Sequence, residues 1–132
     1  AGLALVARSG HGGRHRHINQ PDYFALPKLL KDNYVCDVAY VDGMHSFEYT
    51  FLDFFYIDRL LGVGGLIGFN DCGMPAVEKV INYIDTHSHY VEEYLEPVSW
   101  FQKRHLKYWE YPDRWFRKNK SHTVAWDFYK EF

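Results

Sequence analysis

Three side chains that could bind a metal or catalyse a reaction lie near the ends of two apolar segments in the middle of the sequence. Asp42 follows CDVAYV, Asp71 follows GGLIGFN, and His45 comes three residues after Asp42. Both segments have the continuous apolar character of parallel strands covered on both faces. Because the carboxyl ends of parallel strands meet at one crevice, we expect the two carboxylates and the imidazole to converge there.

Carboxylates in such a crevice suit a hard divalent cation. Mg²⁺ takes oxygen ligands and is commonly held by one or two protein carboxylates, which leaves coordination positions for substrate oxygens. Asp42 and Asp71 are the expected ligands, and Asn70 or Cys72 could add a third. The side-chain oxygen of Asn70 is the more natural of these two for a hard ion.

A structural interpretation of the same residues is open at this point. Asp42 precedes Gly43 and could form a turn while its side chain caps the next helix. Asp71 could likewise cap a helix that begins near Pro75. Two such carboxylates on neighbouring strands, with a histidine beside them, favour a functional role.

Alternating helices and strands are expected to position these residues. Apolar periodicity predicts helices over residues 1–9, 21–33, 46–61 and 74–87, and strands around 17–18, 35–41 and 63–70. Ser46 should cap one helix, Gly10 should end another, and Pro27 should shorten or distort a third. This order predicts βαβ units in an α/β fold with a parallel sheet. The alternation of Val124, Trp126 and Phe128 predicts a terminal edge strand.

Composition limits the class of protein. A chain of 132 residues suits one domain, and its net charge of −2 argues against a nucleic-acid partner. Two cysteines and no run of about 18 apolar residues predict a reduced, cytoplasmic protein without a membrane partner. Residues 100–118 mix aromatic and basic side chains, but acidic residues interrupt them, so an amphipathic lid or an oligomer contact is favoured over nucleic-acid binding.

The two strand ends resemble the second half of class I S-adenosylmethionine-dependent methyltransferases, in the O-methyltransferase-like branch. The element D-x-x-x-[IV]-D-G-x-H corresponds to Asp37, Val41, Asp42, Gly43 and His45. The element L-L-x-x-G-G-x-[IV]-x-x-x-D corresponds to Leu60, Leu61, Gly64, Gly65, Ile67 and Asp71. INQPDYFALPKLL and the terminal WDFYKEF are similar to flanking elements of that branch. The resemblance implies a Rossmann-like three-layer sandwich with a mostly parallel sheet.

The resemblance also implies roles for individual residues. Asp42 and Asp71 match the carboxylates that hold Mg²⁺ in metal-dependent members, where Cys72 replaces an amide ligand and His45 replaces a lysine that acts as general base. An imidazole can accept the proton of an acceptor hydroxyl, although His45 could instead be a helix-start residue bonded to a backbone carbonyl. Gln20 and Asp22, together with Asp42 and Gly43, would contact the S-adenosylmethionine cofactor.

The glycine-rich cofactor loop of the family is not found in the sequence. GHGG at residues 10–13 precedes the expected short strand instead of following one and opening a helix. The resemblance therefore implies that the first strand, the first helix and the second strand lie upstream of Ala1. Residues 1–132 would then be one methyltransferase domain, incomplete at its amino end and inactive alone, with an aromatic-rich segment over residues 90–132.

The expected function is methyl transfer from S-adenosylmethionine to a hydroxyl of a small molecule, with assistance from Mg²⁺. One alternative is a metal-dependent hydrolase or hydroxylase-like enzyme that uses the same carboxylates without a methyl donor. Another is a non-catalytic interaction domain whose aromatic C-terminal segment is the contact surface. A sheet edge left open by missing strands also predicts self-association into a homo-oligomer.

Overall fold

The computed structural model describes residues 2–94, 107, 110–121 and 123–132. In chain order its elements are α1 (Gly2–Arg8), the short 3-10 helix η1 (Gly12–Arg14), α2 (Asp22–Lys31), β1 (Cys36–Val41), α3 (Phe47–Leu60), β2 (Leu61–Phe69), α4 (Pro75–His87), β3 (Tyr90–Glu93) and β4 (Arg114–Lys118). The α/β class expected from the sequence is therefore confirmed.

The four strands form one sheet in the order β1-β2-β4-β3. β1 and β2 pair in parallel, whereas β4 is antiparallel to both β2 and β3. It follows that β1, β2 and β3 point in the same direction and that β4 is inserted between β2 and β3. The sheet is therefore mixed, and our expectation of a mostly parallel sheet was wrong. The carboxyl ends of β1 and β2 still lie next to each other, as the βαβ pattern predicted.

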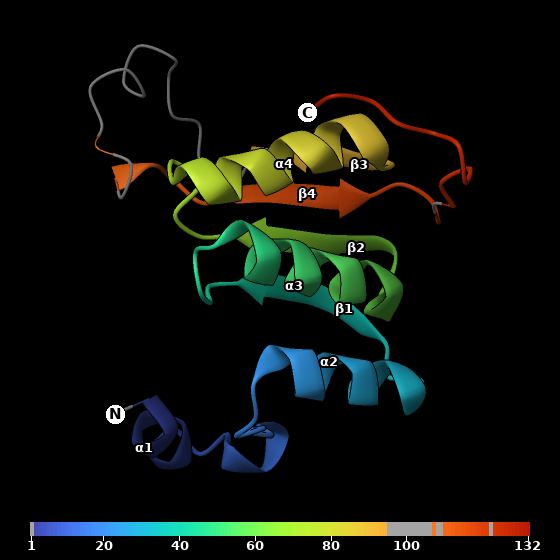
Figure 1. The fold of residues 1–132 in the computed structure, drawn as a ribbon. Coiled ribbons are helices and arrows are strands. Elements are labelled where there is room, and N and C mark those ends of the chain that lie inside the picture. Colours follow the sequence, from blue (N-terminus) through green and yellow to red (C-terminus); the bar gives the residue numbers. More distant parts are fainter. Residues whose placement is uncertain (1, 95–106, 108–109, 122) are drawn as a thin grey trace.

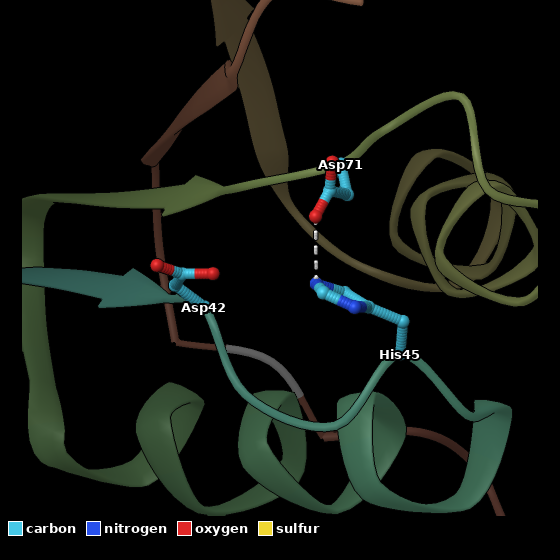
Figure 2. A group of neighbouring side chains, drawn as sticks. All are labelled: Asp42, His45 and Asp71. Atoms are coloured by element: carbon cyan, nitrogen blue, oxygen red, sulfur yellow. Dashed lines mark ion pairs between the residues drawn. The ribbon is translucent and has the colours of Figure 1, made fainter. Parts of the chain in front are cut away.

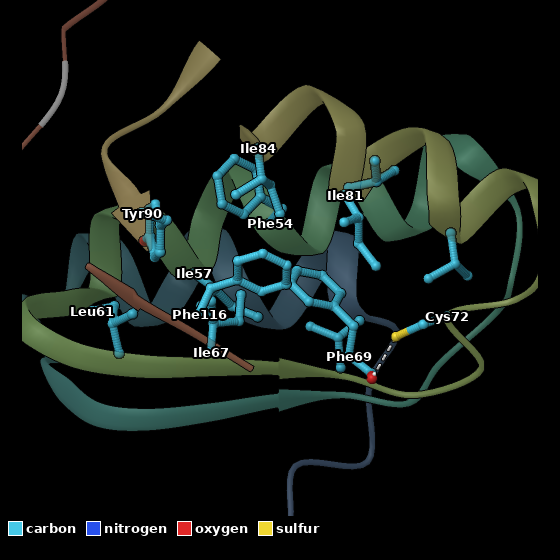
Figure 3. Close-up of a cluster of buried hydrophobic side chains, with 13 residues drawn as sticks. Phe54, Ile57, Leu61, Ile67, Phe69, Cys72, Ile81, Ile84, Tyr90 and Phe116 are labelled. Carbon is cyan, nitrogen blue, oxygen red and sulfur yellow. Dashed lines mark hydrogen bonds between the residues drawn. The ribbon is translucent and has the colours of Figure 1, made fainter. Parts of the chain in front are cut away.

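The core lies between one face of the sheet and the helices α3 and α4, which run side by side (Figure 1). The largest fully buried side chains come from β2, β4 and α4: Ile67, Phe69, Phe116, Val77, Val80, Ile81 and Ile84. Figure 3 shows the cluster that they form with residues of α3, such as Phe54 and Ile57. Burial of this apolar layer holds the ends of β1 and β2 in fixed positions.

The helices follow from local sequence signals. α4 begins at Pro75, whose fixed φ suits a first turn, and it buries the apolar residues that recur at three-and-four spacing. Ser46 occupies the N-cap position of α3 as predicted, although its side chain makes no capping hydrogen bond. Gly10 follows α1 with a left-handed φ of 78°, the conformation expected of a helix stop. α2 continues through Pro27 to Lys31, so Pro27 does not shorten it.

The opposite face of the sheet has no helix over it among the described residues. Val38 and Tyr40 of β1 point to this open face and are 57% and 45% exposed, and Val91 of β3 is also exposed. Our expectation that β1 is covered on both faces was therefore wrong among the described residues, and the three-layer sandwich stays a prediction. The continuous apolar run of β1 packs into the core on one side only, through residues such as Ala39 and Val41.

The strand predictions outside the central βαβ unit were also wrong. Residues 17–18 form no strand, and neither do residues 123–132, which lie against the helices instead. Trp126, expected on one face of a terminal edge strand, is 97% exposed. The last strand of the sheet is β4, and it occupies an interior position. β4 shows no alternation of apolar and polar residues, because each of its faces has both basic and aromatic side chains. Arg114, Phe116 and Lys118 share one face, and Trp115 and Arg117 share the other.

Two global expectations can be compared with the structure. Among the described residues, no helix is both long and apolar enough to cross a membrane. Cys36 and Cys72 are both free thiols, so they form no disulfide with each other.

Candidate functional site

The ends of β1 and β2 are held together by the backbone. The N–H of Asn70 donates to the carbonyl of Val41 at 3.0 Å, which continues the pairing one residue beyond the parallel ladder. Asp42 and Asp71 follow these two residues directly. The main chain therefore brings their Cα atoms to neighbouring positions before any side-chain contact is made.

Asp71 has an unusual backbone conformation. Its φ of 49° is left-handed, a region that Asp and Asn enter more readily than most residues other than glycine. The carbonyl of Asp71 accepts a hydrogen bond from the N–H of Met74 at 2.9 Å, which closes the turn into α4. This turn directs the side chain of Asp71 toward the loop between β1 and α3 (Figure 2).

Asp42, His45 and Asp71 form one cluster (Figure 2). Each offers a ligand atom, and these atoms all lie within 4.8 Å of one another. Nε2 of His45 lies 3.0 Å from Oδ2 of Asp71, and the two side chains are 29% and 25% exposed. The structure thus brings together the three residues that the sequence singled out, at a position that solvent can reach.

Two details bear on the structural interpretation of these residues. The N-cap positions of α3 and α4 are taken by Ser46 and Met74, so Asp42 and Asp71 are not helix caps. Nε2 of His45 is buried and has no hydrogen-bond partner among the described residues, although it is close to Asp71. An imidazole nitrogen in this position, close to two carboxylates, could serve as a metal ligand.

The two further ligands considered from the sequence make other contacts. The side-chain N–H of Asn70 donates to Oδ1 of Asp113 at 3.1 Å. The thiol of Cys72 is buried and donates to the carbonyl of Phe69 at 3.0 Å (Figure 3). Burial raises the pKa of Cys72 to about 11, so the thiol stays neutral at physiological pH. Cys72 is therefore a core residue.

Two of the four residues expected to contact a cofactor, Asp22 and Gly43, lie near Asp53, which the sequence did not single out. Asp53 lies in the second turn of α3 and is 9% exposed, and its Oδ2 is 3.6 Å from where a Cβ on Gly43 would lie. Burial and the adjacent Asp22 carboxylate raise the pKa of Asp53 to about 7. Asp22 and Gly43 are thus both close to one buried carboxyl group, whereas Gln20 and Asp42 are exposed. Asp53 resembled a polar position on the outer face of a helix, so no sequence pattern indicated this pairing.

A second polar group, also missed, lies on the open face beside the cluster. The hydroxyl of Tyr40 donates to Oδ2 of Asp113 at 2.7 Å, and Asn70 contacts the other oxygen of the same carboxylate. The Pro-Asp pair before β4 is a turn signal that could have placed Asp113 at a strand start.

Comparisons with known proteins do not assign the chain to a family. No protein-family model matches the chain, and neither a curated protein nor a solved structure matches it at a significant level.

Proposed function

We propose that this chain works in the methylation of a small-molecule hydroxyl with S-adenosylmethionine as donor, with a divalent cation held by Asp42, His45 and Asp71. The observation that carries the proposal is the convergence of these three side chains at the carboxyl ends of two parallel strands. The spacing of the same residues in the sequence is the basis of the methyltransferase resemblance. A Rossmann-like domain is compatible with the βαβ unit and belongs to the proposal.

The geometry of the cluster fits a cation. When two ligand atoms each lie about 2.1 Å from an ion and the angle between the two bonds is 90°, the ligand atoms are about 3.0 Å apart. The observed separation of His45 Nε2 and Asp71 Oδ2 is 3.0 Å. Opposite ligands would be about 4.2 Å apart, and the three ligand atoms all lie within 4.8 Å of one another.

The ligand set is mixed, which changes the expected metal. If His45 is the third ligand and Asn70 is not, the ion would be bound by two carboxylate oxygens and one imidazole nitrogen. Imidazole favours zinc, iron and other first-row metals, while carboxylates also suit Mn²⁺ and Mg²⁺. Mn²⁺ is therefore a better candidate for this cluster than Mg²⁺. In this arrangement His45 is a ligand, which replaces the general-base role expected from the sequence.

A bound divalent ion would orient an acceptor hydroxyl and lower its pKa. The contribution of the chain itself is positioning. The paired strand ends fix Asp42, the left-handed turn fixes Asp71, and the loop into α3 presents His45. Holding the acceptor in one orientation accounts for much of the rate of such a transfer, because the entropy of association is lost before the reaction.

The decisive experiment is calorimetric titration of the product of the whole reading frame with Mn²⁺, Mg²⁺ and S-adenosylhomocysteine. The proposal predicts that Mn²⁺ binds more tightly than Mg²⁺ and that S-adenosylhomocysteine binds as well. Metal binding without any binding of S-adenosylhomocysteine would favour a metal-dependent hydrolase or hydroxylase-like enzyme. If neither binds, the catalytic proposal fails and an interaction domain becomes the better interpretation.

A further inference from the structure

An aromatic surface lies on the open face of the sheet, next to the proposed metal cluster. The rings of Tyr40 and Trp115 are stacked, with centroids 5.6 Å apart and planes inclined by 24°. Gly68 of β2 lies directly beneath the indole, because a Cβ at this position would be 2.8 Å from three Trp115 ring atoms. The missing side chain therefore lets the indole lie flat against the backbone of β2.

The hydrogen-bonding groups beside this surface converge on one carboxylate. Asp113 is exposed and accepts one hydrogen bond from the Tyr40 hydroxyl and one from the Asn70 amide. A carboxylate has about four acceptor sites, so roughly two remain for a ligand. Asp113 is thus held in place by the protein while part of its acceptor capacity faces solvent.

The same surface adjoins the metal cluster. Tyr40 lies near the end of β1, and Asp42 directly follows that strand. Because successive residues of a strand point in alternate directions, two residues that are two positions apart point to the same face. Asn70, which contacts Asp113, directly precedes Asp71.

The charge of the surroundings disfavours an anionic ligand. Asp42, Asp71 and Asp113 are all acidic, so an anionic ligand would be repelled from the metal-free protein, and Asp113 keeps its charge when a cation binds the cluster. Arg117 also points to the open face, but its guanidinium is bonded to Glu93 and to the carbonyl of Gly64. A neutral ring with several hydroxyl groups suits both the aromatic surface and the Asp113 carboxylate. Its C–H face packs on aromatic rings, and its hydroxyls donate to the carboxylate.

We propose that Tyr40, Trp115, Asp113 and Asn70 form a binding subsite for a neutral sugar ring. This assignment deepens the proposed function, on which the role of the sugar as methyl acceptor rests. The sugar ring packs against the outer side of the stacked Tyr40–Trp115 pair, its hydroxyls donate to Asp113, and a further hydroxyl reaches toward the cluster of Asp42 and Asp71.

The test is NMR titration of the full chain with a panel of neutral methyl glycosides, without metal or methyl donor. We expect millimolar binding that shifts the indole N–H resonance of Trp115. Asp113→Asn should weaken binding about tenfold, as expected for a lost hydrogen bond to a charged acceptor. Trp115→Ala should abolish binding, and Gly68→Ala should weaken it by displacing the indole. Trp126→Ala is the matched control, because that indole is 97% exposed and should leave binding unchanged.

Two results would overturn the subsite. One is the absence of any shift of Trp115 with every glycoside in the panel. The other is a shift with catechol but with no glycoside, which would assign the surface to flat aromatic ligands. Asp113→Asn keeps the test valid if Trp115→Ala does not fold, because Asp113 is an exposed residue directly before β4. Glycoside binding without binding of Mn²⁺ or S-adenosylhomocysteine would leave the subsite standing while the methyltransferase proposal fails.

Discussion

Asp71 combines a candidate ligand with a left-handed backbone, and the two properties can be separated by substitution. Asn tolerates the φ of 49° nearly as well as Asp, whereas most other residues would add strain. Asp71→Asn therefore removes the negative charge while the turn into α4 is retained.

We expect Asp71→Asn to weaken Mn²⁺ binding by at least about tenfold, or about 1.4 kcal/mol, because a charged ligand becomes neutral. The melting temperature should change little, since Asp71 caps no helix. Calorimetry and thermal unfolding measure the two effects. Asp32→Asn, at the exposed end of α2, is the control. Equal loss of stability with unchanged metal binding would make Asp71 a structural residue.

At the level of elements, the junction of α2 and α3 contains a carboxyl group with an altered titration. Burial beside Asp22 raises the pKa of Asp53 to about 7, so folding favours the protonated form. The stability that this group contributes is therefore present below its unfolded pKa of about 4 and is lost as the pH rises through about 7.

Asp53→Asn should remove the loss of folding stability that occurs as the pH rises. We expect the variant to be more stable than the wild type at pH 8, by roughly 2–4 kcal/mol at most, with little difference at pH 4. Asp22→Asn should move the transition to lower pH, because it removes the adjacent negative charge. Urea unfolding at several pH values measures both effects. An unchanged pH dependence in Asp53→Asn would show that Asp53 titrates normally.

The interior position of β4 leads to a test of the topology. Phe116 is fully buried between β2 and α4, whereas Trp126 lies outside the sheet and is 97% exposed. Phe116→Ala should destabilise the fold by about 3–5 kcal/mol, and Trp126→Ala by less than about 0.5 kcal/mol. Chemical denaturation measures both. The reverse order would support the terminal edge strand over residues 124–128 that the sequence predicted.

The molecule as a whole has an open sheet edge as well as an open sheet face. Among the described residues β1 pairs only with β2, and Val35 and Val38 beside this edge are 69% and 57% exposed. An unpaired strand offers its backbone groups to another strand, and apolar side chains strengthen such pairing. The expected homo-oligomer would thus form through β1.

Sedimentation should show self-association that increases with protein concentration. Val38→Lys should reduce it, because a charge beside the edge opposes strand pairing. Val91→Lys is the matched control, since Val91 is 51% exposed on β3 at the opposite edge of the sheet. A monomer at all concentrations, or an equal effect of both lysines, would rule out association through β1.

The sequence by itself determined the central βαβ unit, α4 and the convergence of Asp42, His45 and Asp71. These features depend on local signals: apolar periodicity within each element, Pro75 at a first turn and the direction of parallel strands. Only the tertiary structure decided that β4 enters the sheet beside β2, that helices cover one face, and that Asp113 reaches Tyr40 and Asn70. Each depends on contacts between residues far apart in the chain, such as Ile67 with Phe116, for which a short sequence window contains no information.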